Sequence, residues 1–355
     1  MKKIGILTFH IANNYGAVLQ AYALKTVLKN LGANPQIVNY LSPKIVKDYK
    51  LFSGIRSIND FIKKLFLPKI IINNNKFNNF RKKYLIDTIA LNPKDINNIM
   101  NEYDAFITGS DQVFNMRNTN FDSNYLLSFV KQANKKYSYA ASLGMTELSV
   151  KERIFLKEHL NDFSKISVRE KQAAKIINSL TNKEVLTHLD PTLLLNKEQW
   201  NKLSKCNEKG DYILVYLMSN NDRVLSFAKK LAKEKKLKLI NISLNFLNRT
   251  QIKTISPKPE EWLGYFLKAR YIVTNSFHGL CFSINFNKQF FADFLPNTLL
   301  VNSRLENLLD LTNLRDRLID NIGTNYDKPI DWNSVNETIE EEKEKSLSYL
   351  KSIVL

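Results

Sequence analysis

Short apolar runs alternate with longer amphipathic stretches along the whole chain. Residues 3–9 are apolar or β-branched and predict a buried strand. A polar loop at 10–16 follows, and apolar residues then recur at helical spacing over 17–30, until Gly32 ends the helix. Residues 35–40 predict the next strand. The chain therefore opens with the β–loop–α–β unit of a doubly wound parallel sheet.

The same alternation continues to the end of the chain. Further strands are predicted at residues 104–108, 136–141, 166–168, 185–189, 212–217, 238–242, 271–273 and 289–294. Further helices are predicted at residues 58–66, 73–84, 151–162, 171–177, 222–234, 259–269, 280–286, 303–309 and 332–355. The β–α pattern restarts at residue 212, so we expect two similar α/β halves that divide between about 165 and 210.

Small and polar residues directly follow two of the predicted strands in the first half. Gly109, Ser110, Asp111 and Gln112 follow one strand, and Ser142 follows the next. A glycine lets the backbone approach a ligand closely, and Asp111 is suited to accept a proton or bind a hydroxyl. Capping of a turn or helix by Ser and Asp explains the same residues equally well.

The loop after the first strand occupies the ligand-binding position of such a unit. It contains Asn14, Tyr15 and Gly16, and the first two are suited to hydroxyl groups. Asparagine is also a common turn former, which is the simpler interpretation. The loop has no GxGxxG pattern, so it does not predict a dinucleotide site.

Two further strand ends carry candidate anion ligands. Arg169 follows a short strand and could fork around a carboxylate or phosphate, or equally pair with Glu170 or another acid. Ser276, His278 and Gly279 open a buried helix after a strand, where α/β folds bind anions. A histidine that caps this helix or fills a gap is the alternative.

The composition limits the cellular compartment and the classes of binding partner that we expect. The net charge is +18, from 52 Lys and Arg against 34 Asp and Glu, which suggests an anionic partner or simply a solvated lysine-rich surface. No nucleic-acid-binding motif is present. Two cysteines without close spacing, a start without signal-peptide features and the lack of a long apolar run indicate a cytoplasmic protein. The four histidines lack metal-ligand spacing, so we expect metal-independent chemistry without a cofactor.

Five segments, in order, resemble one family. They are Asn14-Tyr-Gly-Ala-Val-Leu-Gln-Ala-Tyr-Ala-Leu24, Gly109-Ser-Asp-Gln-Val-Phe-Asn115, Ser167-Val-Arg-Glu170, Leu189-Asp-Pro-Thr192 and Ser276-Phe-His-Gly279. Together they are similar to the polysaccharide pyruvyl transferase family, over residues 1 to 315.

The resemblance implies a GT-B type fold, in which two Rossmann-like domains face a cleft. We expect an acceptor-side domain at 1–165, a donor-side domain at 166–330 and a helix at 331–355 that crosses back to the first domain. Phosphoenolpyruvate would be the donor. The acceptor would be a sugar of a surface polysaccharide or of a lipid-linked oligosaccharide.

The resemblance also assigns roles to single residues. Arg169, His278 and Arg304 would anchor the donor, and the segments 14–16 and 109–112 would face the acceptor. The chain departs from the family pattern at Val113, where an aromatic residue is common, and at Ser276, where some members have arginine.

These implications lead to one expected function and two alternatives. We expect a pyruvyl transferase in which His278 acts as general acid or phosphate anchor and Asp111 takes the proton of the attacking hydroxyl. Peripheral contact with an anionic membrane is left open. The alternatives are a GT-B nucleotide-sugar glycosyltransferase and a non-catalytic sugar-binding protein.

Overall fold

The computed structural model describes residues 1–49, 67–206, 208–219, 221–244, 252–295, 302–323 and 325–355. The chain forms two compact units. Unit 1 comprises Met1–Leu194 and Glu342–Leu355, and unit 2 comprises Leu195–Glu341. A helix predicted at 58–66 lies outside the described residues.

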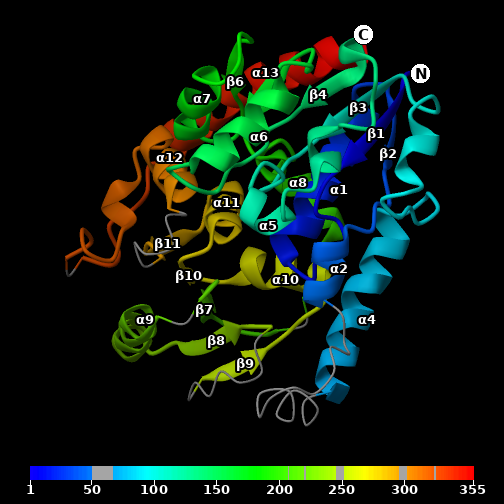
Figure 1. Ribbon diagram of the computed structural model, residues 1–355. Coiled ribbons are helices and arrows are strands. Elements are labelled where there is room, and N and C mark those ends of the chain that lie inside the picture. The colour runs from blue at the N-terminus through cyan, green and yellow to red at the C-terminus, as the bar shows by residue number, and fades with distance from the viewer. Residues whose placement is uncertain (50–66, 207, 220, 245–251, 296–301, 324) are drawn as a thin grey trace. The chain divides into compact units, whose positions relative to one another are not determined.

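Unit 1 is built on a parallel sheet with the strand order β2-β1-β3-β4 (Figure 1). Its strands are β1 (Lys3–Leu7), β2 (Asn34–Ile37), β3 (Ala105–Thr108) and β4 (Lys136–Ser138). Two parallel bridges, Tyr137 to Lys165 and Ala141 to Val168, connect β4 to the pair β5 (Ile166–Val168) and β6 (Val185–Thr187). Because these bridges tie β5 and β6 to the first sheet, unit 1 extends beyond the division predicted after residue 165.

Helices complete unit 1. They are α1 (Tyr15–Asn30), α2 (Pro43–Tyr49), α4 (Leu67–Tyr84), α5 (Met116–Thr119), α6 (Val150–Leu160) and α7 (Lys171–Asn178). The side chain of Asn14 caps α1 by accepting from the Ala17 N–H at 3.2 Å. Leu7, Phe106 and Val168 lie in the hydrophobic cluster that joins the sheet to its covering elements.

Unit 2 repeats the arrangement with a five-stranded parallel sheet of order β11-β10-β7-β8-β9. Its strands are β7 (Tyr212–Tyr216), β8 (Lys238–Ile242), β9 (Lys253–Ile255), β10 (Tyr271–Thr274) and β11 (Gln289–Ala292). Its helices are α8 (Lys197–Leu203), α9 (Asp222–Lys235), α10 (Pro259–Lys268), α11 (Phe277–Asn285) and α12 (Ser303–Leu311). Every residue of α11 from Phe277 to Ile284 is buried, which confirms the predicted buried helix.

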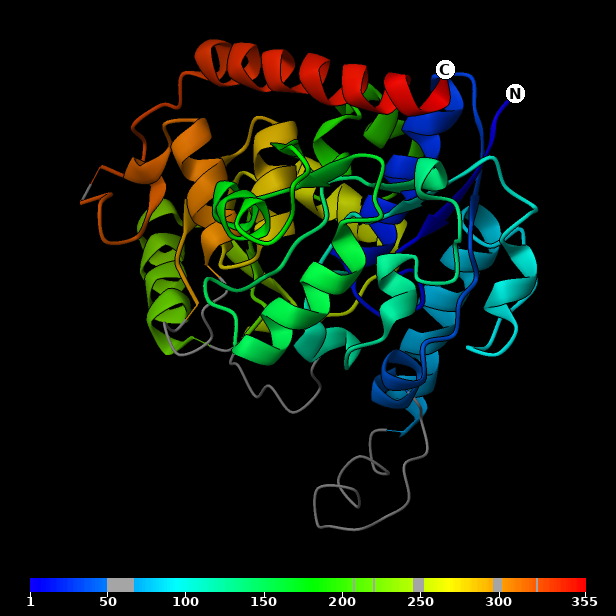
Figure 2. The same cartoon turned by 45° about the horizontal axis from the view of Figure 1, so that its top comes forward.

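The last helix, α13 (Trp332–Val354), begins in unit 2 and ends in unit 1. Its final turns contact the first unit through the Tyr349 hydroxyl, which donates to Ser138 O at 2.8 Å. Lys2 Nζ donates to Ile353 O at 2.8 Å, and Figure 2 shows the two chain ends side by side. The predicted α/β class, with two Rossmann-like halves and a helix that returns to the first, is therefore confirmed.

No helix among the described residues is both long enough and apolar enough to cross a membrane.

Candidate functional site

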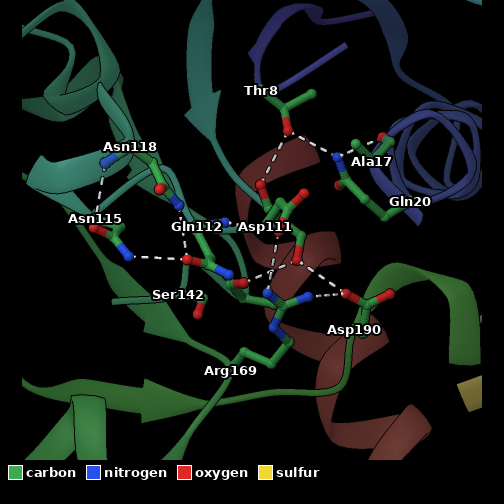
Figure 3. A network of polar contacts seen from close by, with 12 residues as sticks. Thr8, Ala17, Gln20, Asp111, Gln112, Asn115, Asn118, Ser142, Arg169 and Asp190 are labelled. Atoms are coloured by element: carbon green, nitrogen blue, oxygen red, sulfur yellow. Dashed lines mark hydrogen bonds and ion pairs between the residues drawn. The ribbon is translucent and has the colours of Figure 1, made fainter. Parts of the chain in front are cut away.

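The polar residues that follow the strands of unit 1 lie together in one network (Figure 3). Thr8, Asp111, Ser142, Arg169 and Asp190 come after β1, β3, β4, β5 and β6 respectively. Parallel strands place their carboxyl ends at the same edge of a sheet, which explains why residues from five separate segments meet here.

Arg169 lies at the centre of this network. Its Nη1 is 2.5 Å from Asp190 Oδ2, and its Nη2 is 3.5 Å from Asp111 Oδ1. Although burial alone would lower the pKa of Arg169, the carboxylates of Asp190, Asp111 and Glu170 raise this pKa above its ordinary value. Of the two interpretations left open by the sequence, pairing with an acid is the one that the structure shows. The predicted donor contact of Arg169 stays a prediction.

Asp190 is a site residue that the sequence analysis did not select, although it lies in one of the quoted motifs. It is buried, and its Oδ1 accepts from Thr192 N at 2.9 Å and from Thr192 Oγ1 at 2.7 Å. Its Oδ2 accepts from Ser110 Oγ at 3.3 Å as well as from Arg169. An aspartate between a strand and a proline is the only sequence signal that pointed to it.

Asp111 is the acid of this network that reaches solvent, with its side chain 13% exposed. Its Oδ1 accepts from Gln112 N at 2.9 Å and faces Arg169. Its Oδ2 has no hydrogen bond within the part of the chain that the structure describes. One carboxylate oxygen is thus held by the protein, and the other remains available to accept a proton or a hydroxyl hydrogen bond.

The backbone before Asp111 requires a glycine. Gly109 has φ +113°, and a Cβ at this position would lie 2.3 Å from Tyr139 O. The next residue, Ser110, donates from Oγ to Ala140 O at 2.9 Å, and its own carbonyl accepts from Thr8 Oγ1 at 3.0 Å. Gly109 and Ser110 therefore shape the turn that carries Asp111.

Gln112 and Ser142 are engaged in contacts within unit 1. Gln112 Oε1 accepts from Asn115 Nδ2 at 2.9 Å and from Asn118 Nδ2 at 2.8 Å. Ser142 Oγ donates to Glu170. The Gln112 contacts lie within the segment after β3, and the Ser142 contact joins the segment after β4 to the segment after β5. The substrate role predicted for both residues stays a prediction.

The polar loop after β1 is held by contacts within unit 1. Asn14 caps α1, while Tyr15 and Gly16 are buried in the first turn of that helix. Arg81 of α4 donates to Ile11 O at 3.1 Å and holds the loop in place. Asn14 is thus a helix cap, a role that the sequence analysis did not name, and the acceptor contacts predicted for these three residues stay predictions.

Gln20, which the sequence analysis also did not select, lies on α1 beside this network. Its Nε2 donates to Thr8 Oγ1 at 2.8 Å and to Ala17 O at 2.9 Å. Its Oε1 is buried and has no hydrogen bond to any described residue. A glutamine on the buried face of an otherwise apolar helix was the signal available in the sequence.

In unit 2, the start of α11 brings three of the predicted residues together. Ser276 caps the helix by accepting from Gly279 N at 3.3 Å, and His278 lies in the first turn. A Cβ on Gly279 would be 2.3 Å from Thr274 Oγ1, so only glycine fits there. The close packing of α11 on the end of β10 thus fixes the position of His278.

Arg304 of α12 joins the same cluster through Phe277. The Arg304 guanidinium carbon lies 5.7 Å from the centre of the Phe277 ring. The centre of the His278 ring lies 5.3 Å from the same Phe277 ring centre. A helix N-terminus, an imidazole and a guanidinium group are the elements of an anion site. The structure therefore places both His278 and Arg304 beside the Phe277 ring within unit 2.

The two clusters suit different ligands. In unit 1, three carboxylates surround one guanidinium, which favours hydroxyl donors and disfavours anions. In unit 2, the positive end of α11 and two basic side chains favour an anion. Among the described residues, no group of three or more His, Cys, Asp or Glu side chains could hold a metal ion.

Comparisons with known proteins give one family match. The family model described as polysaccharide pyruvyl transferase matches residues 14–292. No curated protein matches the sequence.

Several solved structures are similar to the chain at low sequence identity. Methanocaldococcus jannaschii UDP-GlcNAc 2-epimerase has 12% identity and a TM-score of 0.46, over 82% of this chain and 83% of that one. S. aureus MnaA with UDP has 14% identity and a TM-score of 0.48, over 96% and 88%. E. coli heptosyltransferase WaaC with ADP has 10% identity and a TM-score of 0.40, over 96% and 99%.

Proposed function

Since the chain belongs to the polysaccharide pyruvyl transferase family, we propose that it forms a pyruvate ketal on a sugar. The donor is phosphoenolpyruvate, and the acceptor is a sugar of a surface polysaccharide or of its lipid-linked precursor. The observation that supports this proposal is the pairing of two chemistries in one chain. Unit 2 offers a cationic cluster at a helix start, and unit 1 offers a carboxylate with one available oxygen.

The reaction balances without an oxidant or reductant. A proton adds to the methylene carbon of phosphoenolpyruvate, using the π electrons of the double bond, and leaves an oxocarbenium centre at the neighbouring carbon. A first sugar hydroxyl attacks that carbon and loses its proton. Phosphate then leaves with the electron pair of its C–O bond. A second hydroxyl of the same sugar attacks and loses its proton, which closes the ketal.

The donor is assigned to the cluster at the start of α11. Phosphoenolpyruvate carries a phosphate and a carboxylate, and Arg304 together with the N–H groups of the helix start complements such charges. His278 is assigned to bind the phosphate or to protonate the methylene carbon, since an imidazole nitrogen can donate a hydrogen bond or a proton.

The acceptor is assigned to the polar edge of unit 1. Asp111 accepts the proton of an attacking hydroxyl through Oδ2, while Oδ1 stays bound to the backbone N–H of Gln112. A positioned general base of this kind contributes about 10²–10⁴-fold to a rate.

The reaction is assigned to the cytoplasm. The two cysteines of the chain, Cys206 and Cys281, form no disulfide, which fits a reducing compartment. Peripheral contact with the inner membrane face would bring the protein to a lipid-linked acceptor.

The test measures phosphate release from phosphoenolpyruvate with a panel of nucleotide-linked and lipid-diphosphate-linked sugars. We expect His278→Ala to lose at least about 100-fold in kcat and to keep the thermal unfolding of the wild type. His159→Ala, a change at a half-buried histidine of α6, serves as the matched control and should retain activity.

Other outcomes discriminate among the alternatives. Near-normal turnover by His278→Ala would remove the role of the histidine. Calorimetric binding of nucleotide sugars without binding of phosphoenolpyruvate would favour a glycosyltransferase, and acceptor binding without turnover would favour a sugar-binding protein.

A further inference from the structure

We propose that Asp190 is a positioning residue for the acceptor base. Asp190 fixes the Arg169 guanidinium, and the second arm of that guanidinium holds Asp111 in the orientation that receives the hydroxyl proton. This inference rests on the proposed function and extends it to a residue that does not itself contact a substrate.

Asp190 is the most firmly held residue in the series of contacts Asp190–Arg169–Asp111. Its side chain is fully buried, and Thr192 binds Oδ1 through both its N–H, at 2.9 Å, and its hydroxyl, at 2.7 Å. The backbone of Asp190 is also held, because Leu193 N donates to Asp190 O at 2.9 Å. Because two hydrogen bonds hold Oδ1, the orientation of the carboxylate is fixed, and Oδ2 points toward Arg169.

Arg169 transmits this orientation. Its backbone N–H donates to Ala141 O at 3.1 Å, and its side chain is only 3% exposed. A guanidinium group is planar and rigid, so the position of Nη1 on Asp190 also determines where Nη2 lies. That second nitrogen is 3.5 Å from Asp111 Oδ1.

In the series of contacts Asp190–Arg169–Asp111, Asp111 is the residue that reaches solvent. The exposed fraction of the side chain rises from 0% at Asp190 through 3% at Arg169 to 13% at Asp111. Arg169 and the Gln112 N–H share Oδ1, and Oδ2 of Asp111 has no partner among the residues that the structure describes. Figure 3 shows the three side chains in sequence, with Asp111 and Asp190 on either side of the guanidinium.

The local charge favours this role for Arg169 over direct binding of the donor. Asp190, Asp111 and Glu170 all act on the one guanidinium, so its positive charge is already matched by carboxylates. A phosphate placed there would meet three like charges, which is costly at short range in a buried site.

The experiment compares steady-state kinetics of the full-length wild type with those of two variants. Asp190→Asn keeps the shape of the side chain and removes its charge, and Thr192→Val removes one hydrogen bond from Asp190. We expect kcat to fall about 10–100-fold in Asp190→Asn and less in Thr192→Val, with the KM for phosphoenolpyruvate within about twofold of wild type.

Asp162→Asn is the matched control. Asp162 is an exposed acid of unit 1, 66% exposed and 3.6 Å from Lys136, and its variant should match wild type. A donor KM that rises tenfold or more in Asp190→Asn at unchanged kcat would overturn the inference, because it would place Arg169 on the donor. Unchanged kcat in both variants would overturn it as well.

Crystal structures of wild type and Asp190→Asn provide a readout that does not depend on turnover. We expect the Arg169 guanidinium and the Asp111 carboxylate to shift together in the variant, and an unmoved Asp111 would overturn the positional link. A wild-type protein that releases no phosphate would contradict the proposed function instead, while this structural comparison still decides the role of Asp190.

Discussion

Single residues at the strand ends show how far residue type alone predicts a role. Asp111 and Arg169 were selected because an acid and a base at the edge of a parallel sheet are suited to bind ligands. The structure places both in one ion-pair chain, with Asp190 as the third member. The partner of Arg169 is 21 residues away in the sequence, so only the pairing of β5 with β6 brings the two side chains together.

His188 provides a pH-dependent test at this scale. Its ring packs against Tyr139, with centres 6.1 Å apart, and against Tyr349, with centres 4.6 Å apart. Burial lowers its pKa to about 4, against a small opposing effect of Glu342. The unfolded chain binds this proton near ~6.5, so the unfolded state holds more protons between these two values.

The free energy of unfolding should therefore fall as the pH drops from about 6.5 to about 4, by up to about 3 kcal/mol from this residue. In His188→Gln this loss should be much smaller, as measured by denaturant titrations across that range. His159→Gln is the control and should retain the slope of wild type. An identical slope in His188→Gln would show that other groups cause the acid sensitivity.

Among the elements, α13 is the one whose contacts are least visible in the sequence. Its middle is highly charged from Glu340 to Lys345, and its last turns bury Ser346, Tyr349 and Ile353 in unit 1. Ser346 Oγ accepts from Leu189 N at 3.2 Å, directly before Asp190. The helix thereby supports the strand end from which Asp190 projects.

Ser346→Ala tests this support. The change leaves the buried Leu189 N–H without its acceptor, and we expect a loss of about 1–3 kcal/mol in the free energy of unfolding. Ser352→Ala is the matched control, because Ser352 makes an exposed contact with Lys165 and should change stability by less than about 0.5 kcal/mol. Equal stability of the two variants would show that the α13 contact contributes little.

For the whole molecule, the net charge of +18 is the property most open to a direct test. Exposed Lys69, Lys82 and Lys83 lie on α4 together with exposed Ile71 and Ile72, a combination suited to an anionic membrane surface.

We expect the protein to sediment with vesicles that contain acidic phospholipid, and the binding to weaken as salt screens the charges. The double variant Lys82→Glu/Lys83→Glu should bind less. Lys233→Glu/Lys236→Glu carries the same change of charge on exposed positions of unit 2 and should bind like wild type. Equal binding to neutral vesicles would argue that charge does not direct the contact.

The sequence by itself determined the alternation of strands and helices, because burial periodicity is a local property, and most predicted elements agree with the structure within a few residues. It also determined the family, because the ordered set of motifs can be recognised without knowing which residues are in contact. Only the tertiary structure decided that β5 and β6 join the first sheet, that Tyr15 is buried, and that Arg169 pairs with Asp190. These outcomes depend on which distant strand ends become neighbours, and no local pattern of residues encodes that choice.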